Sequence, residues 1–331
     1  MRSCILVTVL AALLAAAAVA CDGGGGSTPT PSATAVVGTP ETAVFACEGP
    51  AETTAPDAGA FPVEVTDSVG NAVTLHEPPR HIVSLSAGHT ETLYAIGAGD
   101  QVTAVDNTSD CPSAVNDLPK VDAFAPSVEQ IAGLEPDLVV IFFDPGDLQS
   151  SLQALDIPVL NLAAPESVEG VYDQTALLGK ATGHSADAGR LVDEMEVAVQ
   201  ELLSRVADEP EAPTVFHEID TKYFSAGSGT FIGDLYGMLG AANIADVTGQ
   251  PYPQMSGEAI IQADPDVIIL ADEDAGESPE TVKARPGWAS VSAVKNGRVY
   301  AIDPDIVSRP GPRLVEALTT LAGYLYPELF P

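Results

Sequence analysis

Few residues of this chain have the types and the spacing that enzyme active sites require. The sequence holds no Gly-x-Ser-x-Gly nucleophile elbow, no His-Glu-x-x-His, no Walker A phosphate loop and no Gly-x-Gly-x-x-Gly fingerprint. Residues 225–229, Ser-Ala-Gly-Ser-Gly, are rich in glycine. A single loop of this kind fits the wall of a binding cleft as well as an active site. The pattern favours binding, with an enzyme on a doubly wound α/β fold as one alternative.

Two histidines are candidate ligand-binding groups. His89 precedes an expected helix, where a neutral imidazole can act as an axial ligand to haem iron or cobalt, or can donate to an anion. It could equally be a helix-entry residue that hydrogen-bonds the backbone. His217 lies on an expected strand near a cleft edge, and with Tyr223 and Phe224 it could form a wall. It could equally be a strand residue with a satisfied partner.

The other three histidines carry no functional prediction. We expect His184 to be exposed at a break between helices, and we assign no role to His76 or His81.

A repeated segment carries two further candidates, Glu129 and Glu258. Residues 127–141 align without a gap on residues 256–270, and both read Ser-x-Glu-x-Ile, a short link, Pro-Asp and an apolar run. The serine predicts a helix N-cap, the proline ends the helical turn, and the apolar run predicts a buried parallel strand. A glutamate at a helix start is favoured by the helix dipole and is exposed. Two copies therefore indicate two similar α/β lobes.

The remaining patterns fit two such lobes. Alternation over residues 61–75 predicts a β-hairpin. Short apolar runs predict strands at residues 82–85, 102–105, 138–143, 157–162, 214–219, 267–270 and 298–302. Helical patterns cover residues 92–96, 231–240 and 312–325.

A long helical pattern over residues 168–207 separates the two repeat copies. Gly183 interrupts it, and Ser185 is a candidate N-cap for its second part. From residue 186 to residue 206 the apolar side chains recur every three or four positions, which is typical of an amphipathic helix. The position favours a connector. We therefore predict an N-terminal lobe over 61–165, a helical connector over 166–210 and a C-terminal lobe over 211–331.

Composition limits the function further. The chain has 331 residues, enough for two domains, and 46% of them are hydrophobic. Its formal net charge is −34, from 13 Lys and Arg against 47 Asp and Glu. Such a surface repels nucleic acid and anionic lipid headgroups. We therefore expect no nucleic-acid partner.

The first 60 residues indicate export and anchoring. Arg2 precedes an apolar segment over residues 5–18 that is too short for a typical transmembrane span. Small residues then precede Cys21, as in a bacterial lipobox, so we predict a signal peptide over 1–20 and lipidation of Cys21. The Gly-, Ser-, Thr- and Pro-rich residues 21–60 are typical of a flexible tether. An ordinary secreted protein is the alternative. Localisation would be extracytoplasmic, at the bacterial cell membrane.

The chain has four cysteines. Cys4 would leave with the signal peptide and Cys21 would carry lipid. Cys47 and Cys111 remain in an oxidising compartment, where a disulfide would join the end of the tether to the first lobe. Two free thiols are the alternative, because sequence does not reveal their geometry.

Several fragments, in order, resemble the periplasmic iron-complex and vitamin B12 binding proteins of ABC importers. They comprise Ile-Val-Ser-Leu-Ser at 82–86, Thr-Glu at 90–91, Ala-Ile-Gly-Ala-Gly-Asp at 95–100, residues 129–140, 231–232, 243–244 and 258–269, and Ser-Arg-Pro-Gly-Pro-Arg at 308–313. The resemblance covers residues 61–328. It implies two Rossmann-like lobes joined by a rigid long helix, with the ligand in the cleft between them.

The resemblance also implies roles for particular residues. One glutamate on each lobe meets basic residues of the permease, and the match falls on Glu129 and Glu258. Tyr252 falls where the vitamin B12 binding protein has a Trp that packs on the corrin. The other cleft positions fall on Phe124, Asp305, Arg309 and Thr108. Thr108 stands where that protein has a Tyr, so the aromatic shell is thinner here.

The partners implied are an ABC transporter permease with its ATPase, a small metal-containing ligand, and the membrane through the lipid anchor. Cobalamin, haem and ferric siderophores share this scaffold, and none would be a catalytic cofactor. Arg309 and Arg313 are the only arginines expected near the cleft in the second lobe. That scarcity favours a corrinoid over an anionic chelate. We expect a monomer, and a surface sensory or adhesive module is the remaining alternative.

Overall fold

The computed structural model describes residues 45, 47, 53–207, 209 and 212–330, which belong to one compact unit, Val37–Pro331. The expected signal peptide, Cys21 and most of the expected tether lie outside the described residues. None of the helices in the described ranges is both long enough and apolar enough to cross a membrane.

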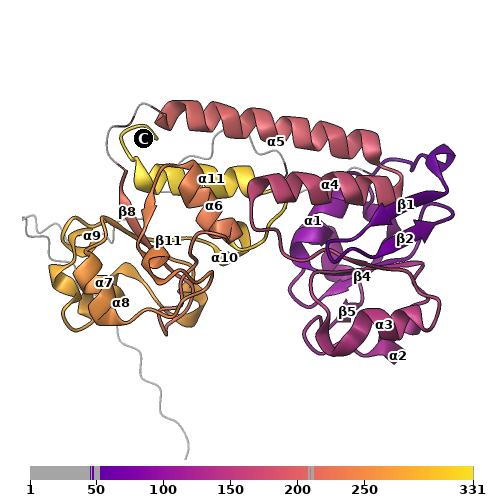
Figure 1. The fold of residues 1–331 in the computed structure, drawn as a ribbon, viewed down its shortest axis with the longest axis horizontal. Helices are drawn as coiled ribbons and strands as arrows, with labels where there is room; N and C mark the ends of the chain where they lie inside the picture. Colours follow the sequence, from indigo (N-terminus) through magenta and orange to yellow (C-terminus); the bar gives the residue numbers. More distant parts are fainter. Residues whose placement is uncertain (1–44, 46, 48–52, 208, 210–211, 331) are drawn as a thin grey trace, which may run out of the picture. The chain divides into compact units, whose positions relative to one another are not determined.

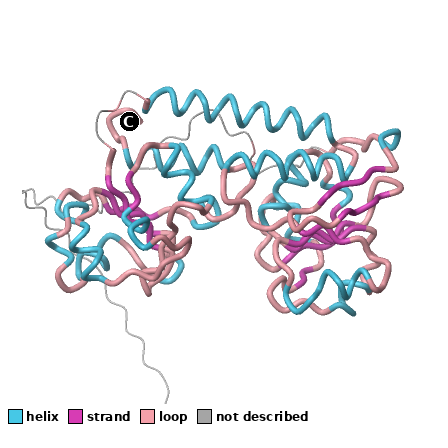
Figure 2. The backbone as a smooth tube through the Cα atoms, viewed as in Figure 1, coloured by secondary structure: helices cyan, strands magenta, loops and turns pink. Residues whose placement is uncertain are grey.

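The first lobe contains a hairpin and a parallel sheet (Figures 1 and 2). The hairpin pairs β1 (Val63–Thr66) with β2 (Ala72–Leu75) in antiparallel register, as expected. The sheet has the order β5-β4-β3-β6-β7, and all its pairings are parallel. Its strands are β3 (Ile82–Leu85), β4 (Val102–Asp106), β5 (Lys120–Val121), β6 (Leu138–Ile141) and β7 (Val159–Asn161). Its helices are α1 (Ala87–Ala95), α2 (Val128–Ala132) and α3 (Leu148–Gln153).

The second lobe repeats this plan with a four-stranded sheet. The order is β11-β10-β8-β9, again with parallel pairings throughout. Its strands are β8 (Thr214–Glu218), β9 (Ala242–Asn243), β10 (Val267–Leu270) and β11 (Val299–Ala301). Its helices are α6 (Phe231–Met238), α7 (Gly257–Ala263), α8 (Pro279–Ala284), α9 (Ser292–Lys295), α10 (Pro304–Val307) and α11 (Leu314–Leu325). The central strands β6 and β10 are buried along their whole length, which is why both read as continuous apolar runs.

The chain passes from the first lobe to the second through two helices, α4 (Val168–Thr182) and α5 (Ser185–Val206). α5 runs alongside α4 and then along α11 of the second lobe (Figure 1). It packs through one apolar stripe, which consists of Leu191, Met195, Val199, Leu202 and Val206. The fold is thus α/β with two lobes and a long helical connection.

The internal repeat has the same local structure in both lobes. Ser127 caps α2 and Ser256 caps α7, each by accepting a hydrogen bond from the backbone N–H three residues later. Glu129 and Glu258 lie in the first turns of these helices, and both are exposed. The strands that follow the two helices are β6 and β10, as expected.

One helix start was predicted wrongly. α1 begins at Ala87 instead of Thr92, so His89 lies in its first turn and not in a loop. The Gly88 in this turn misled the prediction because isolated glycine weakens helices. Its reason is tertiary: a Cβ at Gly88 would lie 2.4 Å from the carbonyl oxygen of Pro310, in the second lobe. Glycine therefore allows the backbones of the two lobes to meet.

The expected exposure of His184 is also wrong. His184, and not Ser185, is the N-cap residue of α5, and its side chain is buried. Its Nδ1 lies 3.0 Å from Oγ1 of Thr54, so residues far away in sequence cover the break between α4 and α5. The break itself is as expected, because Gly183, the C-cap residue after α4, adopts the left-handed conformation.

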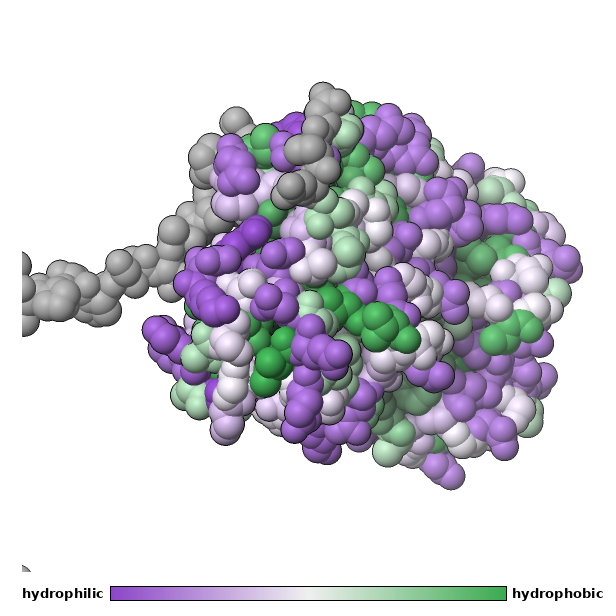
Figure 3. All heavy atoms as spheres, turned by 60° about the vertical axis from the view of Figure 1, so that its left-hand side comes forward, coloured by the Kyte–Doolittle hydropathy of each residue, from purple (hydrophilic) through white to green (hydrophobic). Residues whose placement is uncertain are grey.

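The molecular surface agrees with the acidic composition. On the face drawn in Figure 3, hydrophilic side chains predominate and hydrophobic ones form small separate groups. Large apolar side chains that are exposed include Phe124 and Tyr252, both candidate ligand contacts.

Candidate functional site

A pocket of about 190 Å³ lies where the first lobe meets the loop between α10 and α11. The second lobe contributes Ser308, Arg309 and Pro310 to its lining. The first lobe contributes Ser86, Ala87, Gly88, His89, Asp106, Thr108, Phe124, Phe142, Ala164 and Pro165. Residues of both lobes therefore line the same pocket.

The topology of the first sheet explains why these residues converge. In an open parallel sheet, ligands bind beyond the carboxyl ends of the strands. Ser86 follows β3 and Asp106 ends β4. Phe124 comes after β5, Phe142 after β6 and Ala164 after β7. Every strand of this sheet thus sends a residue from its carboxyl end to the pocket.

His89 is a neutral, buried imidazole on the pocket wall. Its Nε2 lies 3.0 Å from Oε1 of Gln174, whose own amide nitrogen donates to the carbonyl of Ala163. The amide orientation makes Nε2 the donor and leaves Nδ1 with a free lone pair, without a partner among the described residues. Burial lowers the pKa of His89, and the Gln174 hydrogen bond opposes this only in part. His89 therefore stays neutral, the form that can bind a metal.

Three phenylalanines form an aromatic group at the pocket. Phe124 and Phe142 line it, and their ring centroids are 6.2 Å apart in an edge-on arrangement. Phe143 lies 5.5 Å from Phe124 and 4.5 Å from Phe142. The Phe124 side chain is 69% exposed, so its face is free to pack against a ligand.

Thr108, Asp305 and Arg309 lie together beside the pocket. Arg309 Nη2 donates to the Thr108 carbonyl at 3.0 Å and is 2.6 Å from Oδ1 of Asp305. Thr108 Oγ1 donates to Asp106, and so does the hydroxyl of Ser109. Four predicted residues, His89, Thr108, Phe124 and Arg309, thus line one pocket, with Asp305 paired to the last of them.

Three other predicted residues do not line this pocket. His217 is fully buried within the second lobe, where its Nδ1 lies 2.7 Å from the Tyr236 hydroxyl. Burial lowers its pKa to about 4. Tyr223 packs on Trp288, with ring centroids 5.5 Å apart. Tyr252 is 56% exposed on the loop before α7. The expected position of His217 at a cleft edge is therefore wrong, because the hydroxyl of Tyr236 holds it inside.

A polar network at the carboxyl ends of β8 and β10 supports the Tyr223 loop. Arg285 donates to both oxygens of the buried Glu218, at 2.7 and 2.5 Å, and to Glu277 at 2.6 Å. Its guanidinium lies over the rings of Tyr223 and Trp288. Asp272 is buried next to this network, and neither of its carboxylate oxygens has a hydrogen-bond partner among the described residues.

We expect Asp272→Asn to stabilise the protein at pH 8 more than at pH 5. Burial, with Glu218 and Glu277 nearby, raises the pKa of Asp272 to about 7. A raised pKa means that folding favours the protonated form, and this stabilisation is lost as pH rises through about 7. Thermal unfolding at both pH values should give a melting temperature that increases by a few degrees at pH 8 only. The exposed Asp274→Asn is the control, and equal shifts of the Asp272 variant at both pH values would contradict the assignment.

Several residues of this site were not predicted from the sequence. Phe142 was placed inside the expected strand 138–143, but β6 ends at Ile141, so Phe142 comes after the strand and reaches the pocket. Gln174, on α4, could not be predicted, since nothing in its local pattern places it against His89. Glu91 and Asp110 were missed for the same reason, although both pair with arginines from the other lobe.

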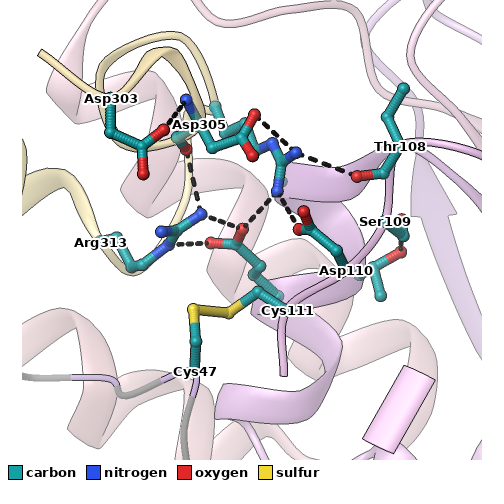
Figure 4. A network of polar contacts seen from close by, with 12 residues as sticks. Cys47, Thr108, Ser109, Asp110, Cys111, Asp303, Asp305 and Arg313 are labelled. Carbon is teal, nitrogen blue, oxygen red and sulfur yellow. Dashed lines mark hydrogen bonds and ion pairs between the residues drawn. A yellow bond between two sulfur atoms is a disulfide. The ribbon is translucent and has the colours of Figure 1, made fainter. Parts of the chain in front are cut away.

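Cys47 and Cys111 form a disulfide, the first of the two alternatives that the sequence left open. Cys111 directly follows Asp110, and Figure 4 shows the bridge beside the ion pairs of Arg313. Within the described ranges, no group of three or more His, Cys, Asp and Glu side chains is arranged to hold a metal ion.

Most of the chain is similar to a known protein family. Residues 82–306 match the model of a periplasmic binding protein family. The ABC transporter substrate-binding lipoprotein YvrC of Bacillus subtilis (strain 168) is 34% identical over 279 residues, 82% of this chain and 87% of that protein. A cobalamin-binding protein of Halobacterium salinarum is 31% identical over 304 residues, 88% of this chain and 81% of the relative.

A solved structure supports the same relationship. The periplasmic heme-binding protein RhuT of Roseiflexus sp. RS-1, in its apo form, superposes with a TM-score of 0.69 and 25% identity. The match covers 76% of this chain and 99% of that one. The similarity thus extends over both lobes and their helical connection.

Proposed function

Because the chain belongs to the periplasmic binding protein family, we propose that it captures a cobalamin-like corrinoid or an iron complex outside the cytoplasm and delivers it to an ABC importer. The observation that carries this proposal is the pocket walled by both lobes, with the neutral His89 and the exposed face of Phe124 at its surface. An aromatic face suits a flat macrocycle, and a neutral imidazole suits an axial metal position. In this proposal the protein binds and releases its ligand without changing it chemically.

Purification from the native host followed by an absorbance spectrum and metal analysis tests this function. A corrin spectrum, a Soret band or a ligand-to-iron charge-transfer band would identify the class of ligand. Conversion of the bound compound during incubation would favour the enzyme alternative. Failure to retain any metal complex, or to bind one on addition, would contradict the proposal and favour a sensory or adhesive role.

We further propose that Glu129 and Glu258 contact the permease. Both carboxylates are exposed in the first turn of a helix, at equivalent positions of the two lobes. A pair of matched acidic residues, one on each lobe, suits a partner with two basic patches. The ligand residues are separate from this pair, since neither glutamate lines the pocket.

We expect Glu129→Ala with Glu258→Ala to reduce ligand uptake by cells while leaving ligand affinity unchanged. Surface charges at a rim mainly affect association with the partner. Phe124→Ala should do the reverse, through loss of a ring worth on the order of 1 kcal/mol beyond its buried area. Uptake assays and calorimetry measure the two effects. The control is Asp193→Ala with Glu201→Ala, two exposed acids of α5. Normal uptake by the double glutamate variant would remove the docking assignment.

A further inference from the structure

The two arginines near the pocket are occupied by carboxylates. Arg309 lines the pocket, and its side chain is only 12% exposed. Its Nη1 lies 2.6 Å from Asp110 and 3.5 Å from Glu91, both in the first lobe. Its Nη2 is engaged by Asp305 and by the Thr108 carbonyl. Both terminal nitrogens therefore already have acceptors, and a ligand would have to displace them.

Arg313 is engaged more deeply. Its Nε and Nη2 donate to the two oxygens of Glu91, at 2.9 and 2.6 Å, and Nη2 also donates to the Asp305 carbonyl at 3.0 Å. Glu91 is fully buried and Arg313 is 8% exposed. This two-pronged geometry is the strongest pairing that arginine makes with a carboxylate. Arg313 is thus not available to a ligand.

Acidic side chains outnumber basic ones beside the pocket. Asp106 lines the pocket and accepts from the hydroxyls of Thr108 and Ser109, which carry no charge. Glu91, Asp110 and Asp305 pair with the two guanidinium groups, and Asp106 is a fourth carboxylate beside them. Lys120 adds one further cation, since its ammonium group donates to the Ser109 carbonyl, so four carboxylates lie beside three cations. His89 adds no positive charge, because its neutral form is favoured by burial. The ion pairs of Arg309 and Arg313 are 2.6 to 3.5 Å long, well inside the screening distance of about 8 Å at physiological salt.

We propose that Glu91, Asp110 and Asp305 determine ligand specificity: they occupy both guanidinium groups, so the pocket accepts neutral or cationic metal complexes and excludes anionic ones. An anionic group of a ligand would have to displace a carboxylate from Arg309. It would also be repelled by the carboxylates that outnumber the cations beside the pocket. The carboxylates would thus select ligands by repelling anionic groups as well as by attracting cationic ones. This inference rests on the proposed function and narrows it to a class of ligand.

Asp110 and Asp305 are the residues with which to test this role. Their side chains are 57% and 41% exposed, so their replacement by asparagine should not disturb folding. Asp110 is held in place by its neighbour Cys111, which is bridged to Cys47. The Asp110→Asn, Asp305→Asn double variant keeps the shape of both side chains and removes two of the three carboxylates that pair with Arg309, leaving Glu91 at 3.5 Å.

The experiment compares two probes, cyanocobalamin, which has no net charge, and haemin, which carries two propionates. Calorimetry should give a haemin affinity that rises about tenfold in the double variant, the effect of gaining one hydrogen bond between charged groups. Cyanocobalamin affinity should change less than threefold. The exposed Asp193→Asn is the matched control and should alter neither affinity.

The outcomes separate this inference from the proposed function. If the native protein binds neither probe nor a ferric siderophore, the proposed function fails and this inference fails with it. If the native protein binds one of them but both affinities fall in parallel in the double variant, the two aspartates only hold the lobes together, and the charge selection is overturned. A haemin gain that disappears at high salt would support the electrostatic cause.

Discussion

The Glu91→Gln variant should lose about 3–5 kcal/mol of unfolding free energy, because it leaves a buried guanidinium without its counter-charge. Glu91 is fully buried on α1, and Arg313 reaches it from the start of α11 in the other lobe. Gly88 and Pro310 touch one turn away. The pair therefore contributes to how the two lobes are held together.

Urea unfolding followed by circular dichroism measures this effect. Replacing both partners, as Glu91→Leu with Arg313→Met, should recover much of the loss, since an apolar pair leaves no buried charge unpaired. A loss below about 1 kcal/mol for Glu91→Gln would place the pair among exposed ion pairs, which contribute that little. Such a result would contradict the burial described for it.

We expect Cys21→Ser to move the protein from the membrane fraction to the soluble fraction. Small residues precede Cys21 as in a lipobox, and a relative from Bacillus subtilis carries the name of a lipoprotein. Serine cannot form the thioether that carries the lipid, and each buried CH₂ of an acyl chain contributes about 0.8 kcal/mol to membrane binding.

Cell fractionation with immunoblotting measures the change. Cys4→Ser is the matched control, because Cys4 lies in the segment that a signal peptidase would remove. It should leave the protein with the membrane. If the Cys21 variant remains membrane-bound to the same extent as the native protein, the protein is held there in another way.

The fold was largely predictable because its signals are local. The apolar runs of β6 and β10, the serine caps of α2 and α7, and the stripe on α5 each follow from a short stretch of sequence. The start of α1 was not predictable in this way. Gly88 lowers helix propensity locally, and only the approach of Pro310 explains why glycine stands there.

The site was predictable only in part, because several of its contacts join residues that are far apart in sequence. His89 was predicted from its residue type and its place before a helix, and Thr108, Phe124 and Arg309 from a resemblance to a family; the structure brings all of them to one pocket. Asp305 lies four residues before Arg309, but Asp110 and Glu91 lie about 200 residues from the arginines they pair with, so no local pattern reveals those pairs. His217 was misplaced because its partner, Tyr236, lies on a different element, α6.

The disulfide also determines where a lipid anchor at Cys21 would be attached to the folded protein. With Cys47 bridged to Cys111, an anchor at Cys21 reaches the folded body after 26 residues and not at residue 60. A segment of 26 residues spans roughly 90 Å at most when fully extended. The segment ends next to Asp110, on the side where the lobes meet. An anchor at Cys21 would therefore attach the protein close to its pocket, which limits how far a bound ligand lies from the membrane.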